Sequence, residues 1–200
     1  MKEESVSVKQ GKKALFYLIV QYQTDKIEAE RTIQMGNGNR GNTMIIKNGL
    51  VFTPEGKFEK KDFYIEGEYV AKETTDNKEV EAEGCYVIPG LVDIHFHGCV
   101  RHDMCDGTEE SIQALADYEA ANGVLAICPA TMTIPEEELF QAMNAAREHK
   151  NGKGADLVGI NMEGPFVNKE KKGAQKEEDI KTADVELFHK LQEAAGGLIK

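Results

Sequence analysis

The segment from Tyr86 to Gly98 constrains the fold most, because a short apolar run in it ends in two histidines. Leu91 to His95 is too short for a helix and follows a glycine, which favours a buried strand. Side chains two residues apart on a strand share a face, so His95 and His97 are expected to point together at its carboxyl end. Two converging imidazoles are typical of half a site for a first-row divalent metal. An ordinary pair of polar residues at a strand end is the alternative.

From Pro89 onward, short apolar runs alternate with stretches in which hydrophobic residues recur at the helical period. The pattern predicts strands at residues 91–95, 124–131 and 157–162, and the start of a fourth at 198–199. It predicts helices from about Thr108, from a capping box at Thr133–Glu136, and from about Asp184. Strand–helix alternation at this spacing predicts parallel βαβ units, and therefore an α/β fold over residues 89–200.

The chain before Pro89 has two parts of different character. Residues 44–88 carry only short strand patterns, with a turn expected at Asn48-Gly49, and predict a small β unit. Residues 1–43 lack such regularity: their apolar run, Ala14 to Val20, is too short to span a membrane, and a Gly/Asn-rich stretch follows. We expect residues 1–43 to be a disordered or non-native leader, with a genuine flexible arm as the alternative.

Glu163 is the third candidate ligand, because it ends the third apolar run and Gly164-Pro165 stops the strand there. The carboxyl ends of parallel strands meet at one edge of a sheet, so Glu163 is expected at the same edge as His95 and His97. One carboxylate and two imidazoles suit a catalytic metal ion that keeps open positions. A solvated glutamate at a turn is the ordinary alternative.

Composition limits the partners and the compartment. The net charge of −11 argues against nucleic acid or an anionic membrane as the main partner. The four cysteines include no CxxC pair, which predicts reduced thiols in a cytoplasmic protein. Lys169, Lys171 and Lys172 offer positive charge to a phosphate, although a lysine-rich loop is usually only solvated. His102 lies in the loop after the first strand and is a weaker candidate for the same pocket.

Two motifs resemble known families. Pro89 to Gly98 resembles the opening signature of the amidohydrolase superfamily, metal-dependent hydrolases built on a (β/α)8 barrel. Glu163 to Phe166, followed by Lys171 to Ala174, is similar to the signature of the N-acetylglucosamine-6-phosphate deacetylases, and the similarity runs from Met44 to Lys200. The resemblance implies an incomplete (β/α)8 TIM-type barrel over residues 89–200, preceded at 44–88 by the N-terminal part of a β-sandwich.

The resemblance also implies roles for individual residues. Glu163 would be a metal ligand, His95 and His97 would hold a second metal, and Ala174 would contact the sugar. Gln175 stands where the family commonly has histidine, which puts the detailed substrate contacts in doubt. The implied cofactor is a divalent ion (Zn, Fe, Mn or Co; one or two per subunit). The implied reaction is hydrolysis of N-acetylglucosamine 6-phosphate to glucosamine 6-phosphate and acetate in amino-sugar catabolism, by a homodimer when full length.

Chain length sets the last expectation. A closed (β/α)8 barrel needs roughly 250 residues, and 112 follow from Pro89 to Lys200. We therefore expect a C-terminal truncation. The resemblance implies that two further histidine ligands and the general-base aspartate lie beyond Lys200, so that no catalytic residue is assigned here and the fragment is expected to be inactive alone. The alternatives are another amidohydrolase (dihydroorotase-like, or hydrolysing N-acyl amino acids) and a non-catalytic metal-binding fragment.

Overall fold

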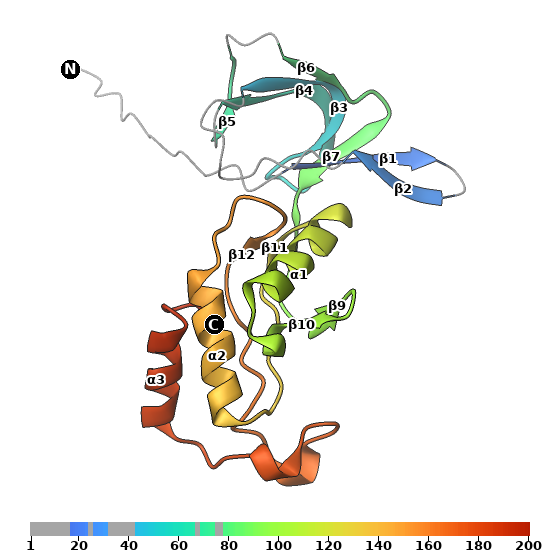
Figure 1. The fold of residues 1–200 in the computed structure, drawn as a ribbon. Coiled ribbons are helices and arrows are strands. Elements are labelled where there is room, and N and C mark those ends of the chain that lie inside the picture. The colour runs from blue at the N-terminus through green and yellow to red at the C-terminus, as the bar shows by residue number, and fades with distance from the viewer. Residues whose placement is uncertain (1–16, 24–25, 32–42, 67–68, 75–77) are drawn as a thin grey trace, which may run out of the picture. The chain divides into compact units, whose positions relative to one another are not determined.

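The computed structural model describes residues 17–23, 26–31, 43–66, 69–74 and 78–200 (Figure 1). These residues fall into two compact units. The first unit ends at Pro89 and the second begins at Gly90, one residue beyond the boundary predicted from the sequence. Each unit is described by itself below.

The first unit is a mixed sheet with its own small core. Its strand order is β2-β1-β7-β3-β4-β5, with β6 paired to β3. The strands are β1 (Tyr17–Gln23), β2 (Lys26–Arg31), β3 (Met44–Phe52), β4 (Phe58–Glu66), β5 (Tyr69–Ala71), β6 (Glu79–Glu81) and β7 (Cys85–Pro89). Apolar residues alternate along β3 and β4, so one face of each strand is buried, and they form a cluster of Met44, Ile46, Val51, Phe63, Ile65, Ala82 and Val87.

Two of these strands lie inside the stretch predicted to be an unstructured leader. β1 pairs antiparallel with β7, with Leu18 opposite Ile88, and also with β2. The expectation of disorder is therefore wrong for residues 17–23 and 26–31. The apolar run Ala14 to Val20 is too short for a membrane span, but its aliphatic and aromatic residues favour a strand. Apart from Thr43, the rest of residues 1–43 lies outside the described residues.

The turn expected at Asn48-Gly49 is also wrong, because β3 continues through both residues. The register of β3 against β4 shifts between Ile46 and Gly49, which marks a bulge. Asn48 has φ of 60°, a conformation that asparagine tolerates. A Cβ on Gly49 would lie 2.6 Å from Val87 Cγ2, so only glycine fits there. The Asn-Gly pair thus serves a bulge within one strand.

The second unit is built on three short parallel strands in the order β12-β11-β8. Its elements are β8 (Leu91–Asp93), β9 (Gly98–Cys99), β10 (His102–Asp103), η1 (Met104–Asp106), α1 (Glu109–Ala121), β11 (Val124–Ile127), α2 (Glu136–Glu148), β12 (Asp156–Leu157), η2 (Lys169–Lys171), η3 (Glu177–Asp179) and α3 (Val185–Ala194). Parallel bridges from Ala130 to Asn161 and from Ile160 to Ile199 continue the sheet beyond these strands. The strands are shorter than predicted, and the Ile199 bridge confirms the start of a fourth.

The order in space of these strands is their order in the chain, with one helix between each pair (Figure 1). Parallel strands need such crossovers, because a tight turn cannot return the chain to the start of the next strand. A doubly wound sheet reverses its order at a switch point, and the described strands show no reversal. The predicted βαβ organisation is confirmed.

The helix starts follow their capping residues in two of three cases. The Thr108 side chain accepts from the Ser111 N–H ahead of α1, and the Asp184 carboxylate accepts from two N–H groups at the start of α3. The helix starts predicted near these two residues are confirmed. The capping box predicted at Thr133 is wrong. α2 begins after Pro135, which has no side-chain cap bond, and the Thr133 N–H donates to a side chain of the candidate site instead.

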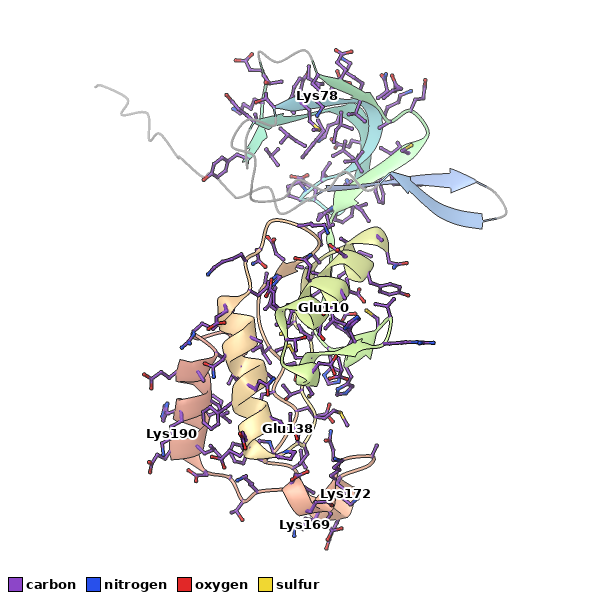
Figure 2. All side chains as sticks on the ribbon, in the orientation of Figure 1. Lys78, Glu110, Glu138, Lys169, Lys172 and Lys190 are labelled. Atoms are coloured by element: carbon purple, nitrogen blue, oxygen red, sulfur yellow. The ribbon has the colours of Figure 1, made fainter. Side chains whose placement is uncertain are left out.

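The helices bury one face and expose the other. The buried residues are Ile112, Leu115 and Ala116 of α1, Leu139, Met143 and Ala146 of α2, and Leu187 and Leu191 of α3. Charged residues such as Glu110, Glu138 and Lys190 occupy the exposed faces (Figure 2). Among the described residues, no helix combines the length and apolar character required to cross a membrane.

Candidate metal centre

The loop after β8 brings the two predicted histidines together. β8 ends at Asp93, so His95 and His97 lie in the loop after the strand and not in the strand itself. Their rings still converge, edge to face, with centroids 5.2 Å apart. The Asp93 carboxylate accepts from the backbone N–H of His95 at 3.0 Å, which starts the loop in a defined direction.

One backbone and one side-chain hydrogen bond, from residues that follow β11 and β12, hold this loop in place. The Ala130 N–H donates to the carbonyl of Phe96, between the two histidines, at 2.7 Å. The Asn161 side-chain amide donates to the carbonyl of Ile94 at 3.1 Å. These bonds continue the parallel pairing past the ends of β11 and β12, so the histidine loop is fixed by the register of the sheet.

Glu163 reaches the same place from the end of the third strand. The Asn161 bridge to Ala130 sets the chain direction, and Gly164 then turns the backbone with φ of 90°. A Cβ on Gly164 would lie 2.5 Å from Thr133 Oγ1 and 3.1 Å from Thr133 Cα. Only glycine allows the Glu163–Pro165 turn to pack this closely on Thr133, which places the carboxylate beside the histidines.

The three candidate ligands form one cluster. Glu163 Oε2 lies 3.3 Å from Nε2 of His95 and 3.3 Å from Nε2 of His97, and the three ligand atoms all fall within 4.8 Å of one another. Two ligands bonded at about 2.1 Å to one tetrahedral ion stand about 3.4 Å apart. The donor set and its spacing therefore fit a divalent cation with N/O ligands, such as zinc or iron.

Gln175 completes the surroundings of Glu163. This side chain is 4% exposed. Its Nε2 donates to Glu163 Oε1 at 2.7 Å, and its Oε1 accepts from the Thr133 N–H at 2.6 Å. The sequence predicts Gln175 only as a substrate contact, because a polar side chain three residues after a lysine pair carries no periodic signal of this role. Ala174 beside it is exposed.

The other candidates lie apart from the cluster. His102 Nδ1 is 3.1 Å from Ser111 Oγ, which in turn donates to Asp106, so this histidine ties the β9–β10 hairpin to α1. Lys169 and Lys172 lie on the loop that carries η2 (Figure 2), and Lys172 Nζ donates to the Gln175 carbonyl at 3.1 Å. The lysines are thus linked to the site through the loop backbone.

Two buried ionisable groups lie near the histidine loop. Burial raises the pKa of the Cys105 thiol to about 12, and its Sγ accepts from the Met132 N–H at 3.1 Å. Burial, followed by the nearby charge of Asp93, raises the pKa of the Glu119 carboxyl on α1. All four cysteines are free thiols. Cys105 is a structural thiol, since a raised pKa suppresses the reactive thiolate.

No protein-family model matches the chain. Curated relatives do: it is 36% identical over 162 residues to N-acetylglucosamine-6-phosphate deacetylase of Bacillus subtilis, covering 78% of this chain and 39% of the relative. It is 27% identical over 165 residues to the enzyme of the same name from Lysinibacillus sphaericus, covering 79% and 43%. The chain thus spans about two fifths of the length of these relatives, and it resembles their N-terminal part.

Solved structures agree on the fold. The crystal structure of N-acetylglucosamine-6-phosphate deacetylase from Pasteurella multocida matches with a TM-score of 0.69 at 20% identity, covering 79% of this chain and 43% of that one. A deacetylase variant from Mycobacterium smegmatis, solved with N-acetyl-D-glucosamine-6-phosphate, matches with a TM-score of 0.64 at 20% identity, covering 80% and 42%. At this identity the likeness establishes a shared mixed α/β fold.

Proposed function

Since this chain resembles the N-terminal part of N-acetylglucosamine-6-phosphate deacetylases, we propose that it is part of a hydrolase that cleaves the acetamide of N-acetylglucosamine 6-phosphate. The products would be glucosamine 6-phosphate and acetate. The observation that carries the proposal is the convergence of His95, His97 and Glu163 from two distant motifs, in a chain whose curated relatives carry that name.

We propose that the second unit is the first part of a (β/α)8 barrel, and that the first unit is part of a β-sandwich. The consecutive parallel order supports the barrel, because each βα unit adds one strand beside the last. Val92 and Ile94 support it as well: they are 54% and 68% exposed, unusual for apolar residues at a strand and its end. Further strands of a longer protein would cover them.

His95, His97 and Glu163 would hold a divalent metal ion. Such an ion, when bound, supplies Lewis-acid activation of the amide carbonyl and of water. The chain's own residues provide the setting: each imidazole offers its Nε2 as a ligand atom, Glu163 offers Oε2, and Gln175 keeps that carboxyl group in place. The resemblance implies only that the ion is divalent (Zn, Fe, Mn or Co) and that each subunit holds one or two.

The remaining parts of the site would come from outside these 200 residues. His97 Nδ1 is buried and has no hydrogen-bond partner among the described residues, whereas metal-ligating histidines usually donate from their second nitrogen. No described residue stands in position for a general base, so the aspartate expected in this role stays a proposal. Ala174, exposed beside Gln175, would contact the sugar. We also propose a cytoplasmic homodimer; free thiols suit a reducing compartment.

The test is acetate release by a longer protein that contains this chain. Wild type and Glu163→Gln would be compared, with Glu170→Gln as the control on the same loop, exposed and remote from the cluster. We expect wild type and the control to hydrolyse N-acetylglucosamine 6-phosphate, and Glu163→Gln to lose at least about 100-fold, since even indirect partners of a metal site cost 10–100-fold.

The two alternative functions predict different results in the same assay. Hydrolysis of dihydroorotate or of an N-acetyl amino acid, but not of the sugar phosphate, would favour another amidohydrolase. Metal binding with no hydrolysis of any of these substrates would favour a non-catalytic metal-binding protein. The 200-residue chain alone is expected to be inactive, because proton transfer by a positioned base contributes 10²–10⁴-fold. Turnover equal to that of the longer protein would contradict the proposed missing base.

A further inference from the structure

Gln175 has the features of a residue that acts through another. It is buried, yet its neighbours Gly173 and Ala174 are exposed, so the chain turns this one side chain inward. It is held at its backbone as well: its N–H donates to the Lys172 carbonyl and its carbonyl accepts from Lys172 Nζ, each at 3.1 Å. These two bonds to Lys172 hold the backbone of Gln175 in place, in addition to the bonds that its side chain makes.

The two side-chain bonds require one orientation of the amide. The Thr133 N–H can only donate, so the atom facing it must be the amide oxygen. The amide nitrogen then faces Glu163 Oε1, where a carboxylate can only accept. Both bonds are satisfied by the same rotamer, and a flipped amide would lose both. The side chain is thus a rigid link between Thr133, in the loop that follows β11, and Glu163.

This link decides which carboxylate oxygen is available. Gln175 occupies Oε1, whereas Oε2 faces Nε2 of both histidines at 3.3 Å. Gly164 packs against the same Thr133 whose N–H binds Gln175. Thr133, in the loop after β11, therefore holds Glu163 in two ways: it packs against the adjacent Gly164, and it binds Gln175, which binds the Glu163 carboxylate.

We propose that Gln175 is a positioning residue of the metal centre. It holds Glu163 so that only Oε2 is presented to the cation, and it ties the position of that oxygen to Thr133 in the loop after β11. The inference rests on the proposed metal centre but not on the identity of the substrate. A residue with this role affects metal affinity even when the fold is intact, which a purely structural residue does not.

The experiment measures Zn²⁺ affinity of the 200-residue chain at 25 °C by competition with a chromophoric chelator. Gln175→Met keeps the length of the side chain but removes both hydrogen bonds. The matched control is Gln192→Met: Gln192 also bridges a backbone segment, accepting from the Ile199 N–H at 2.9 Å and donating to its carbonyl at 3.0 Å, but it does not contact the ligands. We expect Zn²⁺ affinity to fall 10–100-fold in Gln175→Met and to stay within twofold in the control.

Each outcome has a distinct meaning. Unchanged affinity in a folded Gln175→Met would overturn the positioning role and leave the metal centre standing. Failure of the unaltered chain to bind Zn²⁺ would overturn the centre itself, and the inference with it. If circular dichroism shows that Gln175→Met is unfolded, Gln175→Asn decides: it keeps the amide but is one methylene too short for both bonds. We expect Gln175→Asn to bind Zn²⁺ at least threefold more weakly, and equal binding would refute the proposal.

Discussion

Replacing Gly164 with alanine should destabilise the second unit through two separable effects. Gly164 has φ of 90°, and a left-handed backbone costs an L-residue about 1–2 kcal/mol. The new Cβ would also lie 2.5 Å from Thr133 Oγ1 and 3.1 Å from its Cα, and overpacking of this kind costs about 1–3 kcal/mol. The free energy of unfolding should therefore fall by about 2–5 kcal/mol.

Gly173→Ala separates the two effects. Gly173 lies on the same loop with φ of 60°, but nothing lies within 4 Å of its Cβ position. It carries the backbone cost alone, partly offset by the lower entropy of the unfolded chain, so about 1 kcal/mol or less is expected. The difference between the two variants measures the close approach of Gly164 to Thr133.

The assay is thermal unfolding followed by circular dichroism at 222 nm, which reports on the second unit because α1, α2 and α3 all lie there. A loss of 1 kcal/mol lowers Tm by about 4–8 °C for a domain of 60–100 residues and somewhat less for a larger one. Gly164→Ala should lower Tm by about 8 °C or more, and Gly173→Ala by a few degrees. Equal decreases in the two variants would refute the argument from close packing.

Three further predictions concern other parts of the second unit. Asp184→Ala should cost about 1 kcal/mol in thermal melts, because the carboxylate accepts from two N–H groups that begin α3; no change would mean that solvent replaces the cap. Glu119→Gln should raise Tm at pH 7 and have little effect at pH 4. The folded pKa of Glu119 is raised by burial and by Asp93, so its contribution to stability is full at low pH and is lost as pH rises through that pKa; a constant gain at both pH values would contradict this. Cys105, with a pKa of about 12, should have a thiolate fraction of about 10⁻⁴ at pH 8 and resist iodoacetamide in the folded protein, as mass spectrometry can show against a denatured control.

The parts of this structure that follow from local pattern could be predicted from the sequence. Thr108 and Asp184 identify two helix starts because a capping residue acts on its own next few N–H groups. The alternation of strands and helices predicts the parallel order, since βαβ units permit little else. His95 and Glu163 could be assigned to one rim because each ends an apolar run.

The predictions that were wrong concern features that depend on partners distant in sequence. Asn48-Gly49 is a turn signal by itself, but packing of Gly49 against Val87 makes it a bulge. Thr133 looks like a helix cap until Gln175 takes its N–H from 42 residues away. The strand at Tyr17–Gln23 exists by pairing with β7, which no pattern within the strand specifies. Contacts with residues distant in sequence are the common cause.

The side-chain bond from Asn161 to the Ile94 carbonyl spans 67 residues of sequence, and it has a consequence for the order of assembly. During synthesis the chain emerges from its N-terminus, so both histidines leave the ribosome long before Asn161 and Glu163 do. A nascent chain therefore exposes two unfixed imidazoles until the third strand docks. This contact forms slowly compared with a local helix, because the chain must first lose the entropy of closing a long loop. Convergence of His95, His97 and Glu163 is thus a late event of folding, after the strands have found their order.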